Sequence, residues 1–205
     1  MNRTIQPRRS WLWILGFFSL VLSCSPIPHL QLTYRLPREQ GALAGKNVFL
    51  TVEDLRKDKQ TLGPGARHEF EDPSGGISLS VAKGGTGPGI RKGIYQPPAL
   101  LKEAMESRLK HEGIDVVPET ATPVQLSLLL KSFLLDRVER KWEVSISYEG
   151  RLLKEGKVLS SQIVSGEAER FELMGIEQAE VVIGDLFTDV VNRLDLTRLF
   201  RESGL

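Results

Sequence analysis

The stretch Trp142-Glu143-Val144-Ser145-Ile146-Ser147-Tyr148-Glu149 decides the fold class of this chain. Apolar and polar side chains alternate along it without a break, so an extended strand here has one apolar and one polar face. This alternation is typical of an antiparallel strand that is buried on one face only. We expect Trp142 and Tyr148 to pack in the core beneath a helix, because aromatic residues are common in strands and cores.

The sequence that follows predicts a hairpin. Glu149-Gly150-Arg151 indicates a tight turn, and residues 152–164 return as the partner strand, with Gly156 as a possible bulge. Upstream, alternating leucines at 124–130 predict the first strand of the same meander.

Working outward, the remaining patterns complete an α+β domain. Short apolar runs at 48–52 and 114–117 predict two more strands. Apolar residues recur at three- and four-residue spacing over 98–111 and 176–194, which predicts two amphipathic helices. Strands in this order, with a helix inside the first unit and another at the end, predict a two-layer sandwich. We expect a mixed, mostly antiparallel sheet with two helices packed on one face.

The N-terminus has the parts of a secretory signal. Arg3, Arg8 and Arg9 precede an apolar run at 11–22, which is too short to span a bilayer as a stable helix of ~20 residues. Cys24 follows directly and is the only cysteine in the chain.

The residues before Cys24 resemble a bacterial lipobox, with aliphatic Val21 three positions earlier and small Ser23 just before it. The resemblance implies cleavage between Ser23 and Cys24 and acylation of the Cys24 thiol, with fatty chains such as palmitate. An ordinary cleaved signal with an incidental cysteine and an uncleaved anchor are the alternatives. The Arg8-Arg9 pair also leaves open whether export uses the general or the twin-arginine route.

These patterns divide the chain into a signal peptide at 1–23, a lipidated tether at 24–46 and a single domain at 47–205. Prolines and glycines punctuate the tether, with one extended piece expected at 30–36. Within the domain, residues 62–98 are rich in Gly and Pro and predict an irregular insertion, in which only 77–81 has a strand pattern.

Charge excludes two classes of partner. Without residues 1–23, 24 Lys and Arg face 26 Asp and Glu with the signs interspersed. A nucleic-acid-binding protein normally shows a clustered basic surface, and a membrane-surface helix shows a polybasic face. We therefore expect no nucleic-acid partner, and membrane attachment through the N-terminal lipid alone.

Residues that could support catalysis or metal binding are scattered. The Gly-rich run at 84–93 has Ile90-Arg91 where a phosphate loop needs Lys and Ser or Thr. His29, His68 and His111 lack metal-ligand spacing, and the acidic run at 68–72 is more typical of a solvated loop than of a weak cation site. We expect no enzyme activity, no cofactor and no metal.

Four residues form the candidate interaction surface. Asp54 and Arg56 follow the predicted strand at 48–52, where they could form a recognition edge. Alternatively, Asp54 caps a turn and Arg56 pairs with a neighbour. Leu129 and Phe133 would join an apolar patch if the second face of the sheet is uncovered, and such a patch would mark a partner or lipid contact.

The pattern from Val48 through Asp54-x-Arg56 to Leu62-Gly63 resembles the opening of the YajG-like bacterial lipoproteins. The similarity continues through the helix at 98–111 and the closing helix with its Asp195-Leu196 tail. It implies an outer-membrane lipoprotein that faces the periplasm, and Ser25 after the cysteine implies the same membrane.

Three functions follow from these patterns. We expect a non-enzymatic binding or assembly lipoprotein of the cell envelope, with an envelope protein as its partner. An auxiliary lipoprotein of an ABC-type lipid transport system is the alternative. A periplasmic enzyme is the third, and it would need a cleft with clustered titratable groups.

Overall fold

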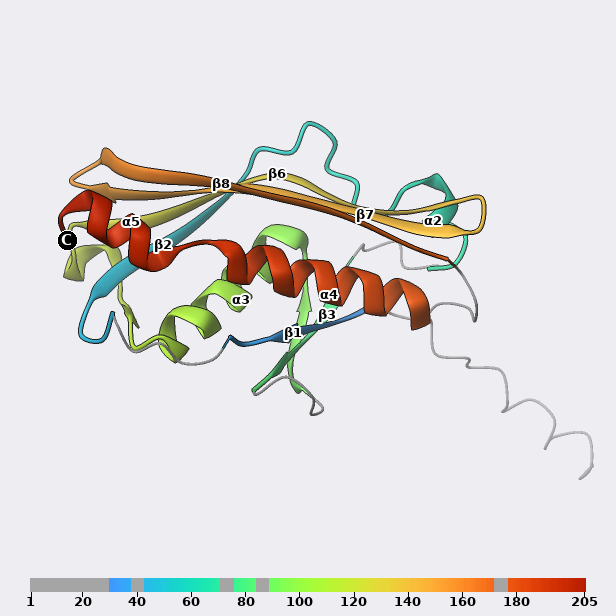
Figure 1. Cartoon of the computed structure of the whole chain (residues 1–205), viewed down its shortest axis with the longest axis horizontal. Coiled ribbons are helices and arrows are strands. Elements are labelled where there is room, and N and C mark those ends of the chain that lie inside the picture. The colour runs from blue at the N-terminus through green and yellow to red at the C-terminus, as the bar shows by residue number, and fades with distance from the viewer. Residues whose placement is uncertain (1–29, 38–42, 71–75, 84–88, 172–176) are drawn as a thin grey trace, which may run out of the picture.

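The computed structural model describes residues 30–37, 43–70, 76–83, 89–171 and 177–205. Cys24, Ser23 and the expected signal at 1–23 lie outside these residues. In the described part, a layer of helices lies between a larger and a smaller sheet (Figure 1). The larger sheet has the strand order β5-β2-β6-β7-β8. Its strands are β2 (Asn47–Asp54), β5 (Asp115–Val116), β6 (Val124–Val138), β7 (Lys141–Lys154) and β8 (Lys157–Phe171).

The larger sheet is mixed, as the sequence predicts. β2 runs parallel to both β5 and β6, whereas β6, β7 and β8 form a long antiparallel meander. The helices pack against one face only, which confirms the predicted α+β sandwich. They are α3 (Pro97–His111), α4 (Glu177–Arg193) and α5 (Leu196–Ser203).

Both predicted helices form where their apolar spacing places them. α3 begins at Pro97, which suits a first helical position because its missing N–H has no helical partner there. α4 buries an apolar stripe against β7 and β8, with Val182, Leu186 and Val190 on it. Trp142 and Tyr148 are fully buried on the inner face of the sheet, as expected.

A second sheet covers the other side of the helices, and the sequence did not predict it. Its order is β1-β3-β4, with β1 parallel to β3 and β4 antiparallel to it. The expected tether boundary at residue 46 is therefore wrong, because the piece at 30–36 is a buried strand of the domain. These strands are β1 (Gln31–Arg35), β3 (Ile77–Ala82) and β4 (Ile90–Tyr95).

The insertion at 62–98 is more regular than its Gly and Pro content indicates. It holds β3, β4 and a short helix, α2 (Pro64–Arg67). Of these three elements, α2 is attached to β6 through the Asp136 carboxylate. Asp136 accepts hydrogen bonds from the backbone N–H groups of Gly65 and Ala66 at 3.0 and 3.2 Å. Gly63 and Gly65 allow this approach, since a Cβ on either would lie within about 2 Å of β6 atoms.

The meander turns at different places from those predicted. Glu149-Gly150-Arg151 lies inside β7, and the chain turns instead at Glu139-Arg140 and Glu155-Gly156. Glu139 and Glu155 have left-handed backbone angles, with φ of 56° and 50°. Gly150 instead allows Leu194 to pack closely against β7, because a Cβ at position 150 would lie only 2.8 Å from Leu194 Cδ1.

Helix α4 takes the place of a neighbouring strand along the free edge of β1. Glu180 accepts from the Gln31 N–H at 2.8 Å, and Thr188 Oγ1 accepts from the Arg35 N–H at 3.2 Å. Further along, the Asn192 side-chain amide donates to the Arg35 carbonyl at 3.0 Å. These side-chain bonds satisfy edge groups that a bare strand would leave open to another chain.

Candidate functional site

The predicted pair Asp54 and Arg56 lies where β2 ends, beside the neighbouring strand β6. Arg56 donates from Nε to Asp54 Oδ1 and from Nη2 to Oδ2, both at 2.9 Å. Its backbone N–H also donates to Asp54 Oδ1 at 3.1 Å. Asp54 therefore caps the turn and holds the guanidinium in a two-pronged pair.

A second cation completes this cluster. Lys59 Nζ lies 2.7 Å from the Asp54 carbonyl oxygen and 3.2 Å from its carboxylate. The hydrogen bond from Arg56, with a smaller contribution from Lys59, lowers the pKa of the Asp54 carboxyl to about 2. Asp54 is thus charged at any neutral pH, and it fixes the orientation of Arg56.

The two predicted apolar residues do not form an exposed patch. Phe133 is 2 % exposed and points inward, where its ring packs edge-on against Phe187 of α4. Leu129 is 5 % exposed and lies between Glu53 and Glu149 on the neighbouring strands. A β-bulge between Leu130 and Ser132 shifts the alternation by one residue, which directs Phe133 into the core.

A hollow of about 480 Å³ separates the segment after β2 from the middle of β6. Arg56 and Lys131 line it, and the apolar part of its wall includes Leu55, Phe133 and Leu134. The sequence predicted Arg56 and Phe133 here and missed Leu55 and Lys131. The bulge that places Lys131 and Leu134 beside the hollow has no sequence signal, because it arises from pairing with β7.

One nitrogen of the Arg56 guanidinium makes no hydrogen bond within the described part of the chain. The Arg56 side chain is 5 % exposed, and among the described residues Nη1 has no hydrogen-bond partner. A buried donor without a partner costs roughly 1–3 kcal/mol. Arg56 lines the hollow, and Nη1 is a buried donor of its guanidinium that no described residue satisfies.

The hollow opens along the outer face of the sheet toward an acidic end. Ser132, Ser145, Ser147 and Ser165 line a shallower space of about 350 Å³. Beyond it, a third space of about 500 Å³ is lined by Leu134, Val138 and the acidic residues Asp136, Glu143, Glu167 and Glu169. The face therefore runs from a basic, apolar end through hydroxyl groups to an acidic end.

Glu149 balances the positive charge at the basic end. Lys131 Nζ and Arg151 Nε each lie 2.7 Å from one of its carboxylate oxygens. Hydrogen bonds, first from Arg151 and then from Lys131, lower the pKa of Glu149 to about 2. The ion pair with Glu149 therefore fixes the orientation of the Lys131 side chain at the rim of the hollow.

The described histidines lie away from the hollow. His111 Nε2 is 2.8 Å from the Pro37 carbonyl oxygen, His68 is exposed at the end of α2, and His29 lies outside the described residues. Of the acidic run at 68–72, the last two residues also lie outside them. Among the residues that the structure describes, no group of three or more His, Cys, Asp or Glu could hold a metal ion.

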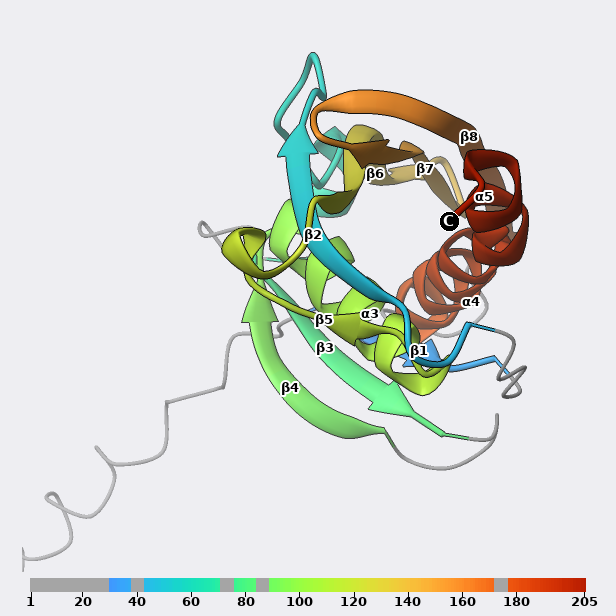
Figure 2. The ribbon, with the colours of Figure 1, turned by 90° about the vertical axis from the view of Figure 1, so that its left-hand side faces the viewer.

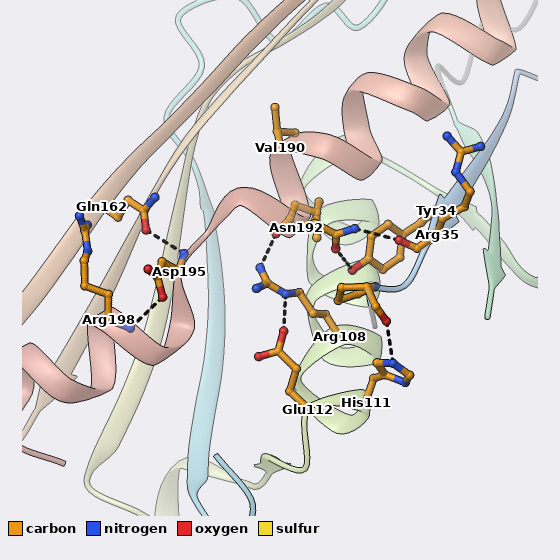
Figure 3. A network of polar contacts seen from close by, with 12 residues as sticks. Tyr34, Arg35, Arg108, His111, Glu112, Gln162, Val190, Asn192, Asp195 and Arg198 are labelled. Carbon is orange, nitrogen blue, oxygen red and sulfur yellow. Dashed lines mark hydrogen bonds and ion pairs between the residues drawn. The ribbon is translucent and has the colours of Figure 1, made fainter. Parts of the chain in front are cut away.

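A separate polar network lies in the helix layer, around the C-terminal end of α4 (Figure 3). Arg108 of α3 pairs with Glu112 at 2.8 Å and donates from Nη1 to the Val191 carbonyl at 2.5 Å. Tyr148 donates to the Val190 carbonyl at 3.0 Å, and burial raises the pKa of its hydroxyl. These donors satisfy carbonyl groups that a helix end leaves without partners.

The network also reaches the smaller sheet. The Tyr34 hydroxyl donates to Asn192 Oδ1 at 2.8 Å, and burial raises the pKa of Tyr34 as well. On the other side, Gln162 of β8 accepts from the Asp195 N–H at 2.8 Å, and Asp195 caps α5 through the Arg198 N–H. Most of these contacts join neighbouring elements and the others cap helix ends, so we assign the network to stability.

Within the described part of the chain, no helix combines the length and the apolar character needed to cross a membrane.

Comparisons with known proteins assign neither a family nor a function to this chain. No protein-family model matches this chain, and no curated protein matches it. Among solved structures, it is similar to a Xanthomonas campestris protein of the family DUF330, with a TM-score of 0.49 and 18 % identity over 86 % of this chain and 96 % of that one.

Two further structures are more distant. An uncharacterized protein has a TM-score of 0.40 and 14 % identity, over 82 % of this chain and 97 % of that one. A candidate lipoprotein from Caulobacter crescentus CB15 has a TM-score of 0.33 and 16 % identity, over 52 % of this chain and 80 % of that one. Likeness at these scores assigns no family and no function.

Proposed function

We propose that this chain is a lipid-anchored lipoprotein of the cell envelope whose domain binds another envelope component. The observation that carries the proposal is the uncovered outer face of the larger sheet, hollowed beside a buried Arg56 with a spare donor. A sheet face without a covering layer normally packs against something or is solvated along its whole length. Here it has instead a space of about 480 Å³ that holds charge and apolar surface together.

The chemistry of the hollow defines the partner group that it would accept. Arg56 Nη1 would donate to an acidic oxygen, and Lys131 and Lys57 would add positive charge at the rim. Leu55 and Leu134, which are exposed, would contact an apolar side chain next to that acid. We therefore expect a partner segment in which a carboxylate adjoins a large apolar residue.

A binding role, and not catalysis, is supported by what lines the hollow. Its only titratable acid is Asp58, and neither described histidine borders it. General acid–base catalysis requires such groups within hydrogen-bond reach of the reacting atoms. The chain would hold a partner without changing it chemically.

The N-terminal sequence supports the membrane part of the proposal. Cys24 would carry the lipid after cleavage at Ser23, and Ser25 would direct the protein to the outer membrane, facing the periplasm. The resemblance to YajG-like lipoproteins supports the same location. The alternative function, an auxiliary subunit of an ABC-type lipid transport system, is favoured by the apolar wall of the hollow, and specific co-purification with a transporter permease would select it.

The anchor is tested by Cys24→Ser. We expect the wild-type protein in the membrane fraction, with a mature mass that includes acyl chains, and the variant in the soluble fraction. Persistent membrane association of the variant, or an unmodified thiol in the wild type, would contradict the lipid anchor.

Binding is tested with a photo-crosslinking residue at Leu134 and a matched one at Val181, which is exposed on α4 at 41 % against 37 % for Leu134. We expect a specific adduct at 134 that disappears in the Arg56→Gln background, and none at 181. Equal adducts at both positions, or an adduct that ignores Arg56, would reject the hollow as the docking site.

A further inference from the structure

The smaller sheet has an apolar edge on the side of the molecule opposite the hollow. Ile90 is 74 % exposed and Ile94 is 48 % exposed, and both belong to β4. Among the described strands, β4 pairs only with β3, and Figure 2 shows it as the outermost strand of its sheet. Ile90 pairs with Val81 and Ile94 pairs with Ser78, so the two side chains lie on opposite faces of the smaller sheet and flank its free edge. Two large aliphatic side chains at one edge strand are an aggregation hazard in water, unless something covers that edge.

Positive charge accompanies these isoleucines. Lys83 and Arg91 are exposed next to them, and within the described ranges neither forms an ion pair. Lys92 lies 3.6 Å from Glu103 of α3, so its charge is balanced within the domain. Exposed aliphatic groups flanked by free cations are typical of a surface that rests on phospholipid headgroups.

The length of chain between Cys24 and β1 places this edge close to the anchor. Seven residue steps join Cys24 to Gln31, and a fully extended chain spans at most ~3.5 Å per residue, or about 25 Å. Gln31 pairs with Ser78, and Ser78 pairs with Ile94. Two strand spacings of about 4.8 Å therefore separate Gln31 from Ile94.

We propose that β4, with Ile90, Ile94 and the adjoining Lys83 and Arg91, rests on the bilayer that holds the Cys24 lipid. This inference rests on the lipid anchor of the proposed function and adds a defined orientation to it. The larger sheet, on the other side of the helix layer, then lies farther from the bilayer than β4 does. A short tether alone would limit the distance between the domain and the bilayer. Contact through β4 would also determine which side of the domain faces the lipid.

A single-cysteine experiment tests the orientation, because Cys24 is the only native cysteine and its thiol is consumed by acylation. Ile90→Cys and Ile94→Cys on β4 are compared with Ile163→Cys on β8, which is 63 % exposed on the larger sheet. Each full-length lipidated protein is labelled with a fluorophore and reconstituted into phosphatidylcholine–phosphatidylglycerol vesicles that contain a headgroup-attached quencher.

We expect quenching at positions 90 and 94 to exceed that at 163 by roughly twofold or more, since interfacial residues lie within ~5–10 Å of the headgroups. Equal quenching at all three positions, with all proteins floating with the vesicles, would overturn the orientation and leave the anchor intact. Failure to float, together with an unmodified Cys24, would overturn the anchor itself and the orientation with it. Arg91→Cys replaces either variant that loses its native circular dichroism.

Discussion

Arg108 and Arg56 are buried to nearly the same extent, at 5 % and 6 % exposure, but their surroundings differ. Arg108 lies in the helix layer, where it pairs with the buried Glu112 and donates to the carbonyl end of α4. Arg56 lies beyond the end of β2, where it pairs with the partly exposed Asp54, and its Nη1 has no partner among the described residues. The two arginines are therefore equally buried, but of the two only Arg56 has a buried guanidinium nitrogen without a partner among the described residues.

The largest expected effect is that of Arg108→Ala. It would leave Glu112 buried and unpaired and the Val191 carbonyl without its donor, at a cost of about 3–5 kcal/mol in the free energy of unfolding. Urea denaturation followed by circular dichroism measures this. In the double variant Arg108→Met, Glu112→Leu, most of the lost stability should return, because no buried charge remains. A loss below about 1 kcal/mol in the single variant would show that the network is not structural.

A smaller loss of stability, with a complete loss of binding, is expected for Arg56→Ala. Asp54 keeps Lys59 as a partner and is partly exposed, so we expect only about 1–2 kcal/mol. The Leu134 crosslink should disappear in this variant, whereas Arg151→Ala, on the same face outside the hollow, should keep it. If Arg56→Ala unfolds the domain as severely as Arg108→Ala, the contrast between the two arginines is wrong.

Tyr148→Phe sharpens the structural side of the comparison. Removing the hydroxyl leaves the Val190 carbonyl without its donor, and we expect a loss of about 1 kcal/mol. Tyr95→Phe is the matched control, because that hydroxyl has no hydrogen-bond partner among the described residues. Thermal melts of the two variants should differ by several degrees, and identical melts would show that the Val190 contact contributes nothing.

The smallest expected effect is a pH dependence at the outer face. The pKa of Asp54 is about 2 in the folded chain against an ordinary 3.8, so its ion pair stabilises the fold above about pH 4. That contribution is lost as the pH falls from about 4 to 2. Wild type should exceed Asp54→Asn by less than about 1 kcal/mol at pH 6 and match it near pH 2. A difference that persists at pH 2 would contradict the assignment.

The sequence predicted the elements whose apolar pattern is carried by their own residues. α3, α4 and the strands of the meander follow from helical spacing and strict alternation. An extended piece was expected at 30–36, but its pairing with β3 was not, because about 40 residues separate the two strands. β4 was not predicted, although its partner β3 is the preceding strand. Arg91-Lys92-Gly93 has no strand pattern, and β4 forms because β3 pairs with it and α3 covers it.

The candidate site was also predicted only where its residues form a local pattern in the sequence. Asp54 and Arg56 form a local pair two residues apart, which is visible in the sequence. Phe133 was placed on the wrong face because the bulge at 130–132 depends on the register with β7. Lys131 and Leu134 became part of the hollow through that same shift, which no local pattern encodes.

The position of β1 has a mechanical consequence. If Cys24 carries a lipid as proposed, β1 is the first described strand after it, so a pull on that lipid would reach the domain at β1. β1 is held by β3 on one edge and by Glu180, Thr188 and Asn192 of α4 on the other. A load along the axis of β1 would shear these hydrogen bonds together, whereas a load across it would break them one by one.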